Sequence, residues 1–291
     1  MACVEAFKAE FTRRKVFFQD AKQRELSAPR LTYSLFVCVL QFCSHQGWVL
    51  GHTLFRVSAF LFTLITVIVD DATADTYGLS YFYFTRWCFL CIMIYFLFAS
   101  ISSVYYLCTQ RAMRRKLADS KANADSSETA AQENCKTAPK TKEASLLWFM
   151  KIQWVFYNIA LPSSAIVTII FWGLLYNGWL ITFHSFTTHV VNVILMITEQ
   201  YISSVNTRIL HIHHTAIFGT AYVLFTVILW STTGTIVYPI FDWGTSPALA
   251  TGVMFGIITM YIIAQFLLFF ISHGLEVCAK RYERVETDFE A

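Results

Sequence analysis

Apolar residues fill six long stretches of the chain, and more polar segments separate them. A helix rises about 1.5 Å per residue, so about 20 apolar residues cross a hydrocarbon layer about 30 Å thick. The fifth stretch is short and reaches this length with its flanking residues. The six stretches are residues 50–69, 78–107, 146–176, 181–202, 216–230 and 247–272. The pattern predicts an all-α polytopic membrane protein, a six-helix transmembrane bundle.

The segments outside the apolar stretches define the expected domain organisation. Residues 1–49 are predicted to be a cytoplasmic N-terminal segment in which residues 31–42, too short to span, form an interfacial helix. Residues 50–272 form the transmembrane domain. Within it, residues 112–145 are polar and poor in aromatic residues, which predicts a disordered cytoplasmic loop. Residues 273–291 are expected to be a solvated cytoplasmic tail.

Composition and charge agree with a membrane protein. The chain is 56% hydrophobic and only 14% charged, which excludes an ordinary soluble domain. Loops 70–77, 177–180 and 231–246 contain no Lys or Arg, whereas the other connections and the termini are basic. Basic loops remain in the cytoplasm, so both termini are predicted to be cytoplasmic. The small net charge of +3 gives no reason to expect a nucleic-acid partner.

The fourth apolar stretch, residues 181–202, carries an unusual polar face. At about 100° per residue, His189, Asn192, Met196 and Glu199 fall within roughly 80° of one another on a helix. Lipid cannot solvate such a face, so it must turn toward other helices or a wet cavity. Ionisable residues at this depth are a hypothesis for a functional site.

Helix direction assigns a depth to each polar residue. At the rise of an α-helix, His189 lies roughly 10–12 Å below the outer boundary of the membrane, and so do Thr85 and Arg86, which are adjacent in the second apolar stretch. Arg56 lies roughly 9 Å above the inner boundary, within reach of Glu199. We therefore expect Arg56 and Glu199 to form a structural ion pair, and Thr85 and His189 to lie level with each other.

These residues have simpler interpretations as well. A threonine in a membrane helix usually donates to its own i−4 carbonyl. His189 could be a packed, hydrogen-bonded residue, and Arg86 could reach the outer aspartates or the headgroups. The run of His211, His213 and His214 has no carboxylate or cysteine nearby, so we expect no metal and no cofactor.

Catalysis is the alternative for the outer pair. His189 is a natural general base, and a threonine hydroxyl held against it is the simplest nucleophile. Such a pair suits cleavage of an ester within a lipid; Asn192 could orient the imidazole or the ester, and Arg86 could attract a substrate carboxylate. The sequence has no G-x-S-x-G elbow, H-E-x-x-H motif or P-loop. Spacing alone does not select Thr85 from the other buried threonines.

Residues 50–272 resemble the rolling stone family of multi-pass membrane proteins. The residues that carry the resemblance are His189 and Asn192 in H-x-x-N, Arg208, Tyr222, and Tyr238, Pro239, Asp242 and Trp243 in Y-P-x-x-D-W. This resemblance implies a membrane protein acting in myoblast fusion.

A more distant resemblance is to the androgen-induced family of six-span hydrolases, which cleave fatty acid esters of hydroxy fatty acids. Its residues are Thr85 after Tyr83-Phe84; Pro162, Phe171, Trp172 and Tyr176; His189 ten residues before Glu199; and Tyr238-Pro239. By this resemblance Thr85 is the nucleophile and His189 the base. Tyr238 and Asp242 join Arg86 and Asn192 as candidate substrate-binding residues.

The sequence leaves two functions open, and so leaves open whether the protein is an enzyme. One is an intramembrane, threonine-dependent hydrolase acting on a lipid ester. The other is a non-catalytic membrane protein acting in cell–cell fusion or adhesion through partners. A channel or transporter ranks last, because the chain shows no internal repeat.

Overall fold

The computed structural model describes residues 45–73, 78–125, 146–178, 180–203 and 205–290. Most of these residues are helical, and none of the described residues belongs to a strand. The predicted interfacial helix at residues 31–42 lies outside the described residues. The prediction of an all-α protein is confirmed for the described part of the chain.

Twelve helical elements follow one another along the described chain. They are α4 (His45–Thr73), η1 (Leu79–Phe82), α5 (Phe84–Asp125), α6 (Trp148–Ile170), η2 (Phe171–Leu175), α7 (Phe183–Phe186), η3 (Thr187–Val191), α8 (Asn192–Ile202), η4 (Ile209–His211), α9 (Ile212–Thr233), η5 (Pro239–Phe241) and α10 (Pro247–Glu290). Two of the short elements, η2 and η3, are π-helical turns.

Five of the described helices are long and apolar enough to cross a membrane. They are Val49–Thr73, Phe84–Lys116, Trp148–Leu175, Ile209–Thr233 and Pro247–Cys278. The predicted fourth span corresponds to the helical run of α7, η3 and α8, and its many polar residues keep it out of this set. The number of six spanning helices is therefore not confirmed by length and composition.

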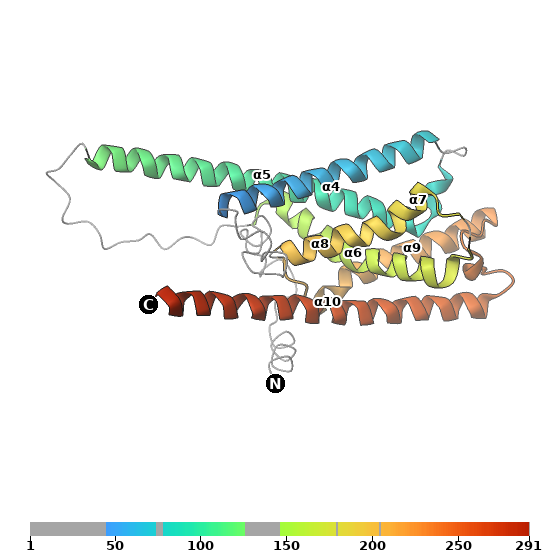
Figure 1. Cartoon of the computed structure of the whole chain (residues 1–291). Helices are drawn as coiled ribbons and strands as arrows, with labels where there is room; N and C mark the ends of the chain where they lie inside the picture. Colours follow the sequence, from blue (N-terminus) through green and yellow to red (C-terminus); the bar gives the residue numbers. More distant parts are fainter. Residues whose placement is uncertain (1–44, 74–77, 126–145, 179, 204, 291) are drawn as a thin grey trace.

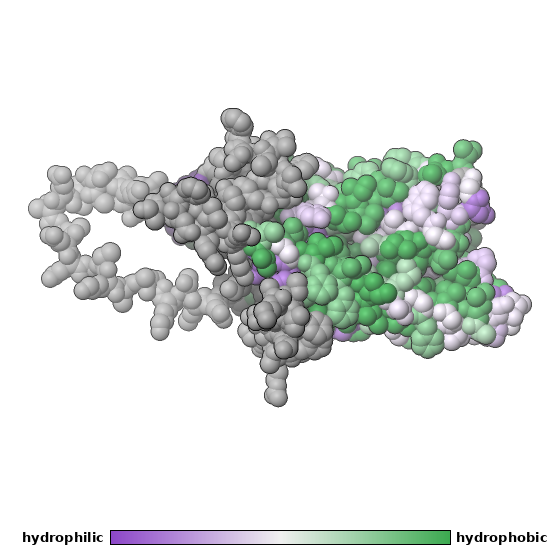
Figure 2. All heavy atoms as spheres, turned by 60° about the horizontal axis from the view of Figure 1, so that its bottom comes forward, coloured by the Kyte–Doolittle hydropathy of each residue, from purple (hydrophilic) through white to green (hydrophobic). Residues whose placement is uncertain are grey.

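The helices run side by side as an elongated bundle, with α4 and α5 along one side and α10 along the other (Figure 1). Helix α6 lies at the centre and contacts α5, α8, α9 and α10. Its buried face supplies Met150, Tyr157 and Leu161 to the core, where they meet Tyr95 and Met196. Hydrophobic side chains also cover much of the described surface on the face that Figure 2 shows, as expected for helices that face hydrocarbon.

Two helices extend beyond their predicted ends. Helix α5 continues to Asp125, so residues 112–125 of the predicted disordered loop are helical, and residues 126–145 lie outside the described part. Helix α10 continues to Glu290 through most of the predicted tail. Residues 112–125 are rich in Ala, Lys and Arg and lack Gly and Pro, and such a composition favours a helix even where it is too polar to enter a membrane.

Candidate functional site

A cavity of about 70 Å³ lies inside the bundle where α5, η2, η3, α9 and η5 meet. Thr85, His189 and Tyr238, three of the residues singled out from the sequence, line it together. The rest of the lining is almost entirely aliphatic and aromatic. The arrangement places the Thr85 hydroxyl of α5, the His189 imidazole of η3 and the phenol of Tyr238, which directly precedes η5, around a largely apolar space.

The Thr85 hydroxyl differs from most other threonine hydroxyls of the bundle. Thr53 and Thr63 donate to their own helix at 2.9 Å, in the usual manner. Thr85 is the second residue of α5, so the residue four positions earlier, Tyr81, precedes the helix, and its carbonyl accepts the Trp87 indole N–H at 2.8 Å. The Thr85 side chain bonds to the Tyr238 hydroxyl instead. Its place at the helix start turns this hydroxyl toward the cavity.

His189 is held by stacking. Its ring lies parallel to the Phe171 ring, at an interplanar angle of 5° and a centroid distance of 3.6 Å. Both rings come from π-helical turns, η3 and η2, and such turns are frequent at functional sites. His189 is only 8% exposed, and its buried Nδ1 has no hydrogen-bond partner among the residues described. Nε2 is thus the ring nitrogen left to meet a group in the cavity.

Thr85 and His189 share the cavity without bonding to each other within the described structure. A catalytic hydrogen bond is often long or absent in an empty site and forms only when substrate is bound. Both side chains border the same cavity. No acceptor orients the imidazole through Nδ1, in contrast to a catalytic triad.

Tyr238 closes the polar end of the cavity. Its hydroxyl oxygen accepts the backbone N–H of Phe84 at 3.0 Å and also meets the Thr85 and Tyr222 side chains. Burial is the main reason that the pKa of Tyr238 rises to about 12. The phenol therefore keeps its proton at neutral pH and can donate it to a bound acceptor.

Arg86 does not line the cavity, and its role in substrate binding stays a prediction. Its guanidinium lies 3.2 Å from an Asp70 oxygen and also bonds to Asp71, both near the end of α4. His184 contributes to the same cluster, with its Nδ1 2.9 Å from Asp70. Two carboxylates already neutralise Arg86, so the simpler interpretation, a contact with the outer aspartates, applies.

Asp242 and Asn192 also lie outside the cavity lining. Asp242 accepts the backbone N–H groups of Gly244 and Thr245, each at 2.9 Å, and the Thr245 hydroxyl. These bonds, chiefly the one from the hydroxyl, lower the pKa of Asp242, and they organise the loop before α10. Asn192 accepts from the Thr168 hydroxyl at 3.4 Å. Both residues bond to neighbouring groups of the protein, and their contact with substrate stays a prediction.

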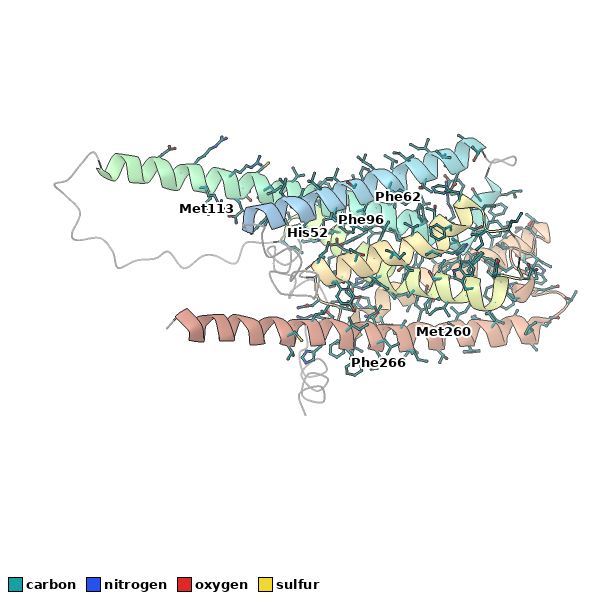
Figure 3. The ribbon with its side chains drawn as sticks, in the orientation of Figure 1. His52, Phe62, Phe96, Met113, Met260 and Phe266 are labelled. Atoms are coloured by element: carbon teal, nitrogen blue, oxygen red, sulfur yellow. The ribbon has the colours of Figure 1, made fainter. Side chains whose placement is uncertain are left out.

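Arg56 and Glu199 form the expected ion pair, about 15 Å from His189 along the helical run. Arg56 Nε lies 3.0 Å from Glu199 Oε1, and both side chains are fully buried. Tyr95 donates to the same carboxylate oxygen at 2.8 Å, and Arg56 donates to Ser103 at 2.7 Å. His52, labelled in Figure 3, approaches the second oxygen at 3.7 Å.

Sequence reasoning missed the partners of this ion pair, although a signal was present. Tyr95 and Ser103 are eight residues apart on α5, and side chains at intervals of four share a helix face. Such a polar stripe on an apolar helix marks the face that meets Arg56. Elsewhere, no group of three or more His, Cys, Asp or Glu residues in the described part of the chain is placed to hold a metal ion.

The fold and the cavity define an all-helical protein with five helices able to cross a membrane. Comparisons of the chain with family models, curated proteins and solved structures found no match.

Proposed function

We propose that the chain is an integral membrane protein with six spans whose internal cavity hydrolyses an ester of a fatty acid. The observation that carries the proposal is that Thr85 and His189 line one apolar cavity, where the Thr85 side chain interacts with Tyr238. The substrate class, a fatty acid ester of a hydroxy fatty acid, comes from the resemblance to the androgen-induced hydrolases. An apolar cavity with a few convergent polar groups is the usual form of a small-molecule site.

The reaction runs through an acyl-threonine. After rotation about Cα–Cβ, Thr85 gives its proton to His189 Nε2 while its oxygen attacks the ester carbonyl. The Tyr238 hydroxyl, whose oxygen accepts the Phe84 N–H, donates a hydrogen bond to the developing oxyanion and keeps its proton. The carbonyl–oxygen bond to the alcohol then breaks, and His189 protonates the departing alkoxide. Water, deprotonated by His189, releases the fatty acid and restores Thr85.

The apolar lining has two roles in this scheme. It solvates the acyl chain, and it excludes bulk water, so the charges that develop on the oxyanion and the imidazolium interact at low effective dielectric. Stacking on Phe171 holds the His189 ring while it gains and loses a proton. The orientation that the charge pattern favours, with both termini cytoplasmic, opens this end of the bundle toward the outer leaflet.

The test is hydrolysis by purified protein in lipid nanodiscs, with the released fatty acid measured by mass spectrometry. Thr85→Ala and His189→Ala should each lower turnover by roughly 10³-fold or more, as removal of a nucleophile or base does. Thr85→Ser should retain part of the activity. Thr226→Ala is the matched control, because Thr226 is buried on α9, bonds to its own helix at 2.8 Å and does not line the cavity. Wild-type turnover in both alanine variants would overturn the proposal.

One observation favours the second function, a non-catalytic protein of cell–cell fusion or adhesion. His189 Nδ1 has no acceptor among the described residues, so the ring lacks the orienting partner of a typical base. In that case the His189–Phe171 stack serves packing alone. Cell fusion that persists undiminished with Thr85→Ala and His189→Ala would support this function.

A further inference from the structure

A second hollow, of about 470 Å³, opens on the outside of the bundle between η1, α5 and α9. Aromatic and aliphatic side chains and the thiol of Cys91 line it; the aromatic and aliphatic residues are Tyr81, Phe82, Trp87, Leu90, Phe218 and Phe225. The Trp87 indole N–H is already bonded to the Tyr81 carbonyl, so this side chain presents its ring to the hollow. The volume falls within the roughly 300–1,000 Å³ of small-molecule sites.

This outer groove and the internal cavity share one wall of aromatic side chains. Phe84 and Tyr222 line the cavity, whereas Trp87 and Phe218 line the groove. Ring centroids across the wall are 4.8 Å apart for Phe84 and Tyr222, 5.3 Å for Trp87 and Tyr222, and 5.5 Å for Phe84 and Phe218. The rings that line the groove therefore pack directly against the rings that line the cavity beside Thr85.

Side chains, and not closely packed backbones, close the seam between α5 and α9. Helix α5 makes its extensive contacts with α4 and α6, and α9 makes its contacts with α6 and α10. Where two helices meet through long side chains, a change of rotamer can open a passage that closely packed backbones would forbid. The seam can open without movement of the helices.

The position of the groove indicates its occupant. Both α5 and α9 are among the helices able to cross a membrane, and neighbouring side chains such as Leu224 and Ile228 are exposed and apolar. Phe218 and Phe225 are seven residues apart, so the groove extends about 10 Å along α9. A narrow, apolar, elongated groove that opens toward hydrocarbon fits a lipid acyl chain, which the bilayer supplies at this depth.

We propose that the α5–α9 seam is a lateral portal that binds an acyl chain from the bilayer and admits it to the cavity through the Phe84–Trp87–Phe218–Tyr222 wall. The proposal rests on the proposed function, because it takes the cavity to be a site for a fatty acyl group. In this proposal the groove binds the acyl chain, and the wall of rings controls entry of that acyl chain into the cavity.

The test uses full-length protein in phosphatidylcholine nanodiscs that contain a C16 fatty acid with a diazirine near its terminal methyl group. After irradiation, labelled peptides are mapped by mass spectrometry. Wild-type protein should be labelled on the groove segments of α5 and α9 and on the cavity peptides around Phe171 and His189. Groove labelling no higher than that of the exposed face of α4, at Leu61 and Ile65, would overturn the proposal.

Two variants test passage in opposite directions. Leu90→Trp fills the groove, and labelling of the cavity peptides should fall about tenfold or more, as overfilling of an apolar site predicts. Phe225→Ala opens the groove, and cavity labelling should rise. Leu224→Trp is the matched control on the exposed face of α9 outside the groove. Unchanged cavity labelling in both groove variants would exclude the portal. Displacement of the probe from the groove by a sterol or by another protein would contradict an acyl chain as the occupant.

Labelling does not require turnover, so the two proposals can fail separately. If wild type hydrolyses no ester but cavity labelling still depends on Leu90 and Phe225, the portal stands and the hydrolase proposal fails. If hydrolysis depends on Thr85 but cavity labelling is the same in wild type and in the groove variants, the hydrolase proposal stands and the portal proposal fails.

Discussion

At the scale of single residues, charge burial dominates the interior. Arg56 and Glu199 are fully buried; Tyr95 donates a hydrogen bond to Glu199, and Arg56 donates one to Ser103. A buried pair adds little net stability compared with an apolar pair, but either partner alone is a charge in a low-dielectric site. The pair therefore fixes how α4, α5 and α8 meet.

Removing one partner of this pair should be strongly destabilising. Arg56→Met or Glu199→Gln should each lower the free energy of unfolding by roughly 3–5 kcal/mol, and the double variant should recover part of the loss. Thermal unfolding in detergent measures the change, with Arg114→Met on the exposed part of α5 as the control. Losses that simply add in the double variant would show that the two side chains do not act as a pair.

Tyr238 makes a prediction about pH. Its pKa is raised to about 12, so the folded state binds the phenolic proton more tightly than the unfolded chain, whose tyrosines titrate near pH ~10. The contribution of Tyr238 to stability is fully present below pH ~10 and is lost as pH rises toward about 12. Tyr238→Phe should show a shallower loss of stability over this interval. Parallel curves for wild type and variant would contradict the assignment.

At the scale of elements, the sequence predicted the helices well and their local geometry poorly. The polar face of residues 181–202 is real, since Thr187, His189, Asn192 and Glu199 are all buried. A uniform α-helix would carry His189 and Asn192 toward the same space, but the π turn η3 lies between α7 and α8 and changes the register. His189 thus reaches the cavity and Asn192 does not. The π turn η3 contacts another element, since its His189 ring stacks on Phe171 of η2. The periodicity of residues along one segment carries no information about such a contact.

Polarity misled the prediction for residues 112–125 in a similar way. Residues 112–125 were assigned to a disordered loop because they are polar, yet their Ala, Lys and Arg content stabilises a helix in water. Ala118→Pro should interrupt this extension, since a proline inside a helix costs about 3 kcal/mol or more. Circular dichroism should show lost helicity with unchanged assembly, and Ala118→Gln should leave the spectrum intact. Equal spectra for the two variants would argue against the helical extension.

At the scale of the whole molecule, the charge pattern predicts the orientation that the proposed reaction uses. Loops 70–77, 177–180 and 231–246 lack Lys and Arg, and the predicted fourth span connects the second of these loops with the connection that contains Arg208, which makes six predicted crossings. In a cysteine-free background, Thr235→Cys should react with an impermeant maleimide on intact cells, whereas Arg115→Cys should react only after permeabilisation. The reverse labelling would invert the topology, and labelling of both sites on intact cells would rule out six spans.

The most direct measurement of the central claim, that Thr85 and His189 form a catalytic pair, is covalent capture of the nucleophile. Purified protein is treated with a long-chain fluorophosphonate, which phosphonylates an activated hydroxyl, and the modified residue is located by mass spectrometry. The proposed mechanism predicts one adduct on Thr85 that is absent in Thr85→Ala, strongly reduced in His189→Ala and unchanged in Thr226→Ala. Labelling that is absent from folded wild-type protein, or that persists unchanged in Thr85→Ala, would contradict it.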